Sequence, residues 1–219
     1  MRRCVAIMLL SLTVRAEIVD RAAVIVGRQV VTELELEEEV RITEFLNQTP
    51  LTLGLEERRA AADRIVQQML IAREMSLSHY PDPSDAEIGQ AFDRLRGLYA
   101  TQHEFVSALA GYKLDEQTVR KHLTAQISAL HFIEYRFRPE LGTSGADLRS
   151  SYQEKAESWA AVHPGFQLPS FEDSLASLRA ALIEKRTDQA LDNWLKETRK
   201  QVRIVFLEQD LGAAEALRD

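Results

Sequence analysis

The chain carries its most β-like sequence in two short segments near opposite ends. Residues 22–32 read AAVIVGRQVVT, two β-branched runs around Gly27, and residues 202–207 read VRIVFL. A glycine between such runs is typical of a hairpin turn, although the segment also fits one irregular strand. A lone strand cannot satisfy its own backbone, and an isolated hairpin is marginally stable. We therefore expect the two ends to pair in one small antiparallel sheet, because the cost of closing a loop grows slowly with its length.

Between these ends the sequence is typical of helices. Nine glycines and six prolines in 219 residues are too few for a chain of many tight turns. Capping-box patterns at 32–35, 84–87 and 101–104 predict three helix starts, and Asp115 and Ser170 predict two more. The expected helices cover 33–47, 55–78, 85–98, 102–109, 116–137, 144–162 and 170–201. The run ELELEEE at 33–39 also alternates with period two, which leaves the first boundary open. The predicted fold is mainly α with a small sheet.

Apolar residues recur at spacings of three and four in the longer helices, which predicts one buried face on each. The expected buried residues are Ala62, Ile65, Val66, Met69, Leu70 and Leu77; Val119, Leu123, Ile127, Leu130, Ile133 and Phe137; and Phe171, Leu175, Leu178, Leu182, Leu191, Trp194 and Leu195. Trp159 and Trp194 are interpreted as core residues rather than as anchors for a ligand.

The first residues, MRRCVAIMLLSLTVRA, have the layout of a secretory signal peptide: a basic start, a short apolar run and small residues before a cut. The alternative is a membrane anchor, but a spanning helix needs about 20 apolar residues and Arg15 interrupts this run too early. Removal of residues 1–16 would leave 24 basic against 34 acidic residues and no cysteine. We therefore expect a periplasmic or extracellular protein with no stable membrane insertion, held together by its core rather than by disulfides.

No pattern in the sequence predicts catalysis. The formal charge of −7 makes nucleic acid a poor candidate partner. His103-Glu104 lacks the second histidine of a zinc-binding HExxH motif, and the motifs of serine hydrolases, phosphate-binding loops and dinucleotide-binding folds are absent from the sequence. We expect no catalytic residue, no metal site and no cofactor.

Three segments, at residues 17–40, 64–96 and 170–207, together resemble the SurA-type periplasmic chaperones. EIVDRAAVIVGRQVVTELELEEEV is similar to their opening hairpin and capped helix, and RIVQQMLIAREMSLSHYPDPSDAEIGQAFDRLR is similar to their next helices. SFEDSLASLRAALIEKRTDQALDNWLKETRKQVRIVFL resembles their terminal helix and closing strand. PrsA-like foldases and trigger factor are related in helical architecture. The resemblance implies a chaperone module built from both ends of the chain. Such proteins commonly carry parvulin prolyl-isomerase domains, but only residues 139–169 occupy that place here, too few for a domain of about 90 residues.

The expected function is therefore a holdase that binds unfolded envelope or outer-membrane proteins through apolar surface, without isomerase activity. The alternatives are residual prolyl isomerisation and a structural or assembly subunit of one envelope complex. The candidate contact residues, each of which also fits a core position, are Leu51, Leu53, Phe92, Leu98, Tyr99 and Phe105. A swapped homodimer is also compatible with the sequence, because the terminal helix and strand could pair with another copy's hairpin.

The expected divisions of the chain are a signal peptide at 1–16, a helical domain at 17–138, a linker at 139–169, a helix and strand completing the core at 170–207, and a tail at 208–219.

Overall fold

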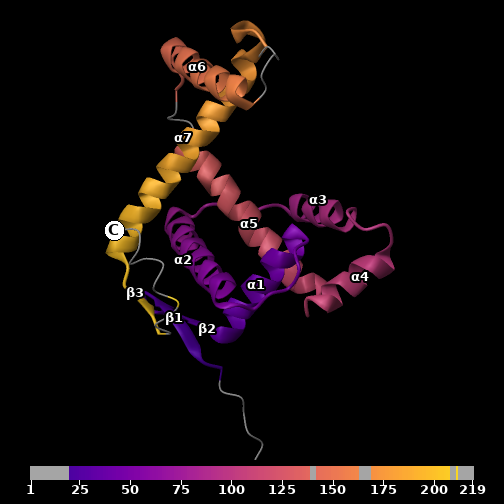
Figure 1. The fold of residues 1–219 in the computed structure, drawn as a ribbon. Helices are drawn as coiled ribbons and strands as arrows, with labels where there is room; N and C mark the ends of the chain where they lie inside the picture. Colours follow the sequence, from indigo (N-terminus) through magenta and orange to yellow (C-terminus); the bar gives the residue numbers. More distant parts are fainter. Residues whose placement is uncertain (1–19, 139–141, 163–168, 208–210, 212–219) are drawn as a thin grey trace, which may run out of the picture.

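The computed structural model describes residues 20–138, 142–162, 169–207 and 211, and within them the fold is mainly α with one small sheet (Figure 1). The predicted signal peptide and most of the predicted tail lie outside the described residues. The elements in chain order are β1 (Ala22–Val26), β2 (Gln29–Thr32), α1 (Glu33–Asn47), α2 (Leu55–Ser78), α3 (Asp85–Arg96), α4 (Gln102–Gly111), α5 (Glu116–Phe137), α6 (Gly145–Val162), α7 (Phe171–Gln201) and β3 (Ile204–Phe206).

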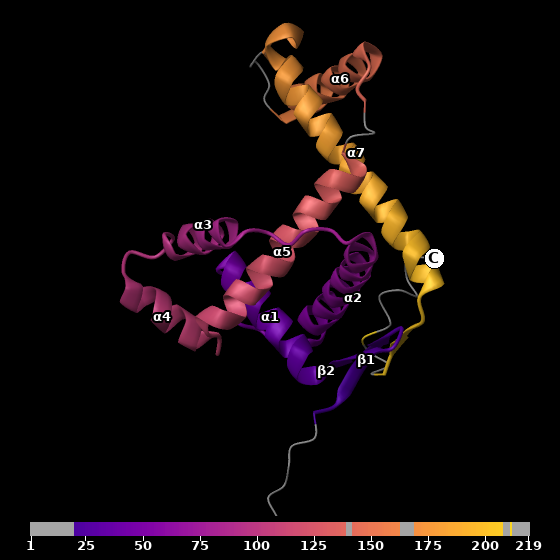
Figure 2. The ribbon, with the colours of Figure 1, turned by 180° about the vertical axis from the view of Figure 1, so that it is seen from behind.

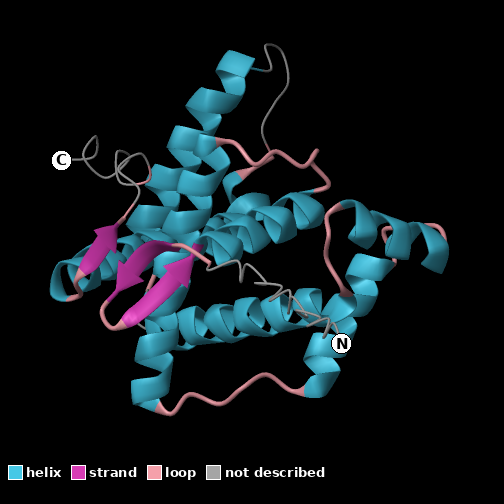
Figure 3. Cartoon of the chain, turned by 90° about the horizontal axis from the view of Figure 1, so that it is seen from below, coloured by secondary structure: helices cyan, strands magenta, loops and turns pink. Residues whose placement is uncertain are grey.

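The sheet joins the two ends of the chain, as predicted. Its strand order is β2-β1-β3, and both pairings are antiparallel (Figure 3). Gly27 begins the hairpin turn with a φ of 63°, a conformation that favours glycine. In the second pairing Ile25 lies opposite Val205, across most of the length of the chain. The hairpin interpretation of 22–32 and its pairing with the terminal strand are both confirmed, and the pairing is made within one chain.

Side-chain caps place the helix starts where the sequence predicts them. Thr32 and Ser84 each form a complete capping box with the glutamate three residues later. Asp115 and Ser170 accept from the backbone N–H three residues on. Thr101 caps α4 in the same way, but the Glu104 carboxylate accepts from the Ala100 N–H instead of closing the box.

Two hydrophobic cores hold the helices together. The first core packs the sheet against α1, α2, the end of α5 and the end of α7, and includes Val24, Leu36, Val66, Phe132 and Leu195. The second core lies between the end of α1 and α3, α4 and α5, and includes Phe45, Phe92, Phe105, Leu109 and Val119. Because α1 and α5 contribute to both cores, these two helices fix the cores relative to each other. Trp194 is partly buried against the first core, with its ring centroid 6.3 Å from that of Phe132.

The third packed unit is a helical hairpin that projects from the rest of the molecule (Figures 1 and 2). In it α6 packs on the first half of α7, where Leu148 and Leu178 are buried, and the Arg186 guanidinium lies 3.0 Å from Asp147 Oδ2. The predicted helix at 144–162 is confirmed, but the segment expected to act as a linker carries a helix with its own packing partner.

Two of the residues predicted to lie on a buried helix face are exposed. Leu77 on α2 is 67% exposed and Leu130 on α5 is 54% exposed, because the helical faces on which they lie extend beyond the neighbours that cover the rest. The expected burial of Val66, Leu70, Val119 and Leu123 is confirmed. Within the described residues, no helix is both long enough and apolar enough to span a bilayer.

Candidate functional site

A groove lies between α1, α2 and α5. It consists of two cavities, of about 470 and 800 Å³, that share Met69, His122 and Ala125 as lining residues. The first cavity begins at β2, and the second continues along α2 and α5 to Leu130 and Ile133. We call the two cavities together the interhelical groove.

Small side chains on α5 leave this space open. Thr124, Ala125, Ser128 and Ala129 line the groove where α5 faces α1 and α2, and Ala72 lines it from α2. Helix axes packed in contact lie 8–10 Å apart, and leucine-sized residues at these positions would fill the space between them. The small residues of α5 between the two cores therefore leave a groove rather than form a third core.

The groove wall combines flexible and exposed apolar groups. Met69 and Met75 both line it, and they are the methionines of the described part of the chain. The unbranched thioether side chain adapts to ligands of different shape, which is why methionine is common at surfaces that bind many partners. Leu130 lines one end and Val30, which is 52% exposed, lines the other. Apolar side chains thus line both ends of the groove and, at Met69 and Met75, the part between them.

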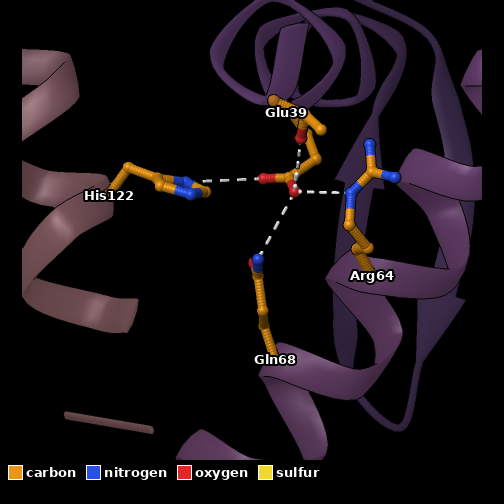
Figure 4. Close-up of polar contacts among 5 residues, drawn as sticks. Glu39, Arg64, Gln68 and His122 are labelled. Carbon is orange, nitrogen blue, oxygen red and sulfur yellow. Dashed lines mark hydrogen bonds and ion pairs between the residues drawn. The ribbon is translucent and has the colours of Figure 1, made fainter. Parts of the chain in front are cut away.

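A buried carboxylate, Glu39 on α1, makes polar contacts with α2 and α5 where the two cavities share lining residues (Figure 4). Glu39 Oε1 accepts hydrogen bonds from Arg64 Nε at 3.1 Å and from Gln68 Nε2 at 3.4 Å. Its Oε2 lies 3.6 Å from His122 Nδ1, on the opposite wall. The Glu39 side chain is only 7% exposed, so the guanidinium supplies the charge compensation that a buried carboxylate needs. This cluster links α1, α2 and α5 at the point where the two cavities meet.

Burial lowers the pKa of His122 from its ordinary value of 6.5. The Glu39 carboxylate opposes this effect, while the Arg64 guanidinium adds to it. His122 is therefore neutral at pH 7, and the pair Glu39–Arg64 carries no net charge. The Glu39–Arg64–His122 cluster is therefore polar and carries no net charge at pH 7.

Among the described residues, no cluster of three or more His, Cys, Asp or Glu side chains could hold a metal ion. The Glu39–His122 pair has the partners of a carboxylate–imidazole dyad, and Glu39 Oε1 also accepts hydrogen bonds from the Arg64 guanidinium, the Gln68 amide and the Thr43 hydroxyl. The arrangement fixes three helices together and presents hydrogen-bonding groups to the groove.

Three of the contact residues predicted from sequence belong to the second core. Phe92 and Phe105 are 1% and 0% exposed, with ring centroids 5.6 Å apart in an edge-to-face arrangement, so of the two alternatives left open for them they occupy core positions in this structure. Tyr99 is half-buried and packs edge-on against Phe105 at 5.4 Å. These aromatic residues stabilise the fold because each ring covers the next.

The other three predicted contact residues lie on loops. Leu98 is exposed after the end of α3, and Leu53 is exposed in the connection between α1 and α2, where Leu51 is half-buried. Thr52 N donates to the buried Glu44 carboxylate at 2.7 Å, which holds this connection against α1. None of the six predicted residues is among the described residues that line the groove. The signals that could have indicated it are Met69 and Met75 and the small residues at 124–125 and 128–129.

Comparison with known proteins assigns no family: no family model matches the chain, and no curated protein matches it.

Proposed function

We propose that this protein is a holdase-type chaperone of the periplasm that binds unfolded segments of envelope proteins in the interhelical groove. The observation that carries the proposal is the groove itself, two neighbouring cavities between α1, α2 and α5 that share lining residues. Each cavity, of about 470 and 800 Å³, falls in the range of known ligand sites, which measure about 300–1,000 Å³. The length of the groove from β2 to Leu130 is suited to an extended chain rather than to a compact ligand.

The composition of the groove supports binding of many sequences rather than one. Apolar groups from Met69, Met75 and Leu130 can cover client side chains, at about 25 cal/mol for each Å² removed from water. The exposed Gln68 amide can accept and donate hydrogen bonds to a client backbone. Contacts of this scattered kind give modest affinity, because ordering a flexible segment offsets much of the gain, and modest affinity permits release.

The compartment and the absence of catalysis are part of the same proposal. The predicted signal peptide at 1–16 supports export, and the net acidic composition supports solubility and a preference for basic clients. The resemblance to SurA-type chaperones supports outer-membrane proteins as clients. We propose binding without prolyl isomerisation, because α6 takes the place in the chain where parvulin domains are commonly inserted.

The proposal is tested by obstructing the groove. Ala125 is exposed on α5 and lines both cavities, so Ala125→Trp would place an indole in the channel without entering a core. Ala180→Trp on the exposed face of α7 adds the same side chain to a helix outside the groove and is the matched control. The assay is light scattering of a denatured outer-membrane β-barrel protein diluted into buffer with the purified chain.

We expect the wild-type chain and Ala180→Trp to suppress aggregation at near-stoichiometric amounts, and Ala125→Trp to need several-fold more protein. Absence of suppression by the wild-type chain would refute the proposal, and equal activity of both variants would refute the groove as the site. Accelerated cis–trans exchange in an Xaa-Pro peptide would instead favour an isomerase. Capture of one stoichiometric protein in place of a mixture of unfolded clients would favour a dedicated assembly subunit.

A further inference from the structure

The outer edge of β2 borders one end of the interhelical groove. Of the three strands, β2 alone supplies lining residues to the first cavity, through Gln29, Val30 and Val31. Since β2 is the first strand in the order β2-β1-β3, one of its edges has no partner strand within the described part of the chain. The cavity therefore lies beyond the edge of the sheet, where another strand could be added.

The register determines which backbone groups face this edge. Gly27 N donates to Arg203 O at 2.8 Å and Leu207 N donates to Ala23 O at 2.9 Å, so the odd-numbered residues of β1 bond toward β3. Antiparallel strands alternate the side to which successive residues bond, so the even-numbered residues of β1 bond toward β2. Val30 lies opposite Ile25, an odd-numbered residue. Its N–H and C=O consequently point away from β1, toward the outer edge.

The available edge is short and is closed at one end. Thr32, two residues further along, also directs its N–H outward, but that group donates to Glu35 Oε2 at 2.8 Å within the capping box. The open donor–acceptor pair is thus the one at Val30, whose side chain is also half-exposed. An added segment would bond at Val30 and then leave the sheet for the groove, where Met69 and Ile65 line the same cavity.

The charges at this end favour a basic segment. Glu35 and Glu38 line the cavity beside β2, and Lys121 lies on the α5 wall. The third lining carboxylate, Glu39, is already compensated by Arg64. The chain as a whole carries a formal charge of −7, so its field attracts a basic partner as well.

We propose that β2 binds an extended basic and apolar segment of a client as a fourth, edge strand, with backbone bonds at Val30 and with basic side chains near Glu35 and Glu38. This inference rests on the proposed chaperone function and specifies its client class: segments with alternating apolar and basic residues. Strand addition gives affinity through the main chain and leaves selectivity to a few side chains, as expected for a binder of unfolded proteins.

The test uses a fluorescently labelled nine-residue peptide of alternating valine and lysine, titrated into the full chain and followed by anisotropy. Its counterpart with glutamate in place of lysine measures the charge preference. Val30→Pro removes the outward N–H, whereas Val30→Thr keeps both the N–H and a β-branched side chain and is the matched control. Because the Val30 N–H does not bond to β1, proline is compatible with this edge position. A lysine peptide with N-methylated backbone amides tests the same bonds on the wild-type chain.

We expect the lysine peptide to bind several-fold more tightly than the glutamate peptide, and Val30→Pro or peptide N-methylation to weaken binding by about tenfold. Val30→Thr should stay within about twofold of wild type, and Glu38→Lys should weaken binding of the lysine peptide by about threefold at low salt. Unchanged binding by Val30→Pro and by the N-methylated peptide would overturn the inference, as would tighter binding of the glutamate peptide. A concentration-dependent dimer of the wild-type chain that Val30→Pro abolishes would also overturn it, since a second copy would then be the occupant.

Failure of this inference is distinguishable from failure of the proposed function. Strand addition fails, and the groove remains the site, if Val30→Pro suppresses aggregation as wild type does while Ala125→Trp does not. The proposed function itself fails if the wild-type chain suppresses no aggregation.

Discussion

The Glu39 cluster allows a quantitative test of how α1, α2 and α5 are held around the groove. We consider Glu39→Gln, which keeps the shape of the side chain but removes its charge. Removing one member of a fully buried ion pair costs about 3–5 kcal/mol, because the remaining charge is left without compensation. Here the Arg64 side chain is 34% exposed, so water screens much of its charge. We therefore expect the free energy of unfolding to fall by about 1–2 kcal/mol.

The same substitution changes the pH dependence of stability. The pKa of His122 in the folded chain is below its ordinary value, so the unfolded chain binds more protons below about pH 6.5 and the free energy of unfolding falls as the pH falls. This loss ends near the folded pKa. The Glu39 carboxylate favours the charged imidazolium, so its removal should lower the pKa of His122 further. We expect the loss of stability in Glu39→Gln to continue to lower pH than in wild type.

The measurement is urea unfolding followed by far-ultraviolet circular dichroism between pH 5 and pH 8, with an NMR titration of His122. A loss of about 1–2 kcal/mol corresponds to a melting temperature lower by roughly 2–8 °C for a chain of this size. Glu38→Gln, one residue away but exposed, is the control and should change the free energy of unfolding by less than about 0.5 kcal/mol. Unchanged stability of Glu39→Gln, or a raised pKa of His122 in it, would refute the reasoning.

Three further predictions concern the cores, the sheet and the projecting hairpin. Phe105→Ala should lower the free energy of unfolding, measured by urea unfolding, by about 3–5 kcal/mol, because it removes a buried ring. Leu98→Ala, at an exposed position, should change it by less than about 0.5 kcal/mol. Equal effects of the two substitutions would contradict the assignment of Phe105 to a core. Val205→Pro removes a backbone N–H donor that faces Ile25, so its free energy of unfolding should be about 3 kcal/mol lower than that of Val205→Thr. Equal stability of the two variants would argue against the pairing of β1 with β3. Hydrogen bonds from the backbone N–H and hydroxyl of Ser144, together with the Arg186 guanidinium, lower the pKa of Asp147 to about 2. The stabilisation that the Asp147 carboxylate gives to the start of α6 should therefore be complete above pH 3.8 and lost as the pH falls through about 2. An ordinary pKa for Asp147, measured by NMR, would contradict this.

The sequence was informative where the physical cause is local. Capping at Thr32 and Ser84 depends on residues three apart, so the helix starts can be read directly. The pairing of β1 with β3 is not local, but it follows from the need of the last strand for a partner in a chain with few other β-type segments. Both were predicted correctly.

The groove could not be predicted in the same way. Periodicity shows that Leu130 shares a face of its helix with buried residues, but it does not show where the neighbour on that face ends. Likewise, Phe92 and Phe105 are apolar and aromatic whether they form a core or a contact surface, and only their packing partners decide between the two. The open space between α1 and α5 results from small residues on one helix facing a charged cluster on another, an arrangement that depends on the tertiary fold.

The most direct test of the groove as the binding site is site-specific photo-crosslinking to an unfolded client. Benzoylphenylalanine would be placed at Ala125 in the groove, at Leu98 on the loop after α3, and at Ala180 on the exposed face of α7. The account predicts crosslinks to a denatured outer-membrane protein from position 125 and not from positions 98 or 180. Crosslinks from position 98 or 180 with none from position 125 would contradict it.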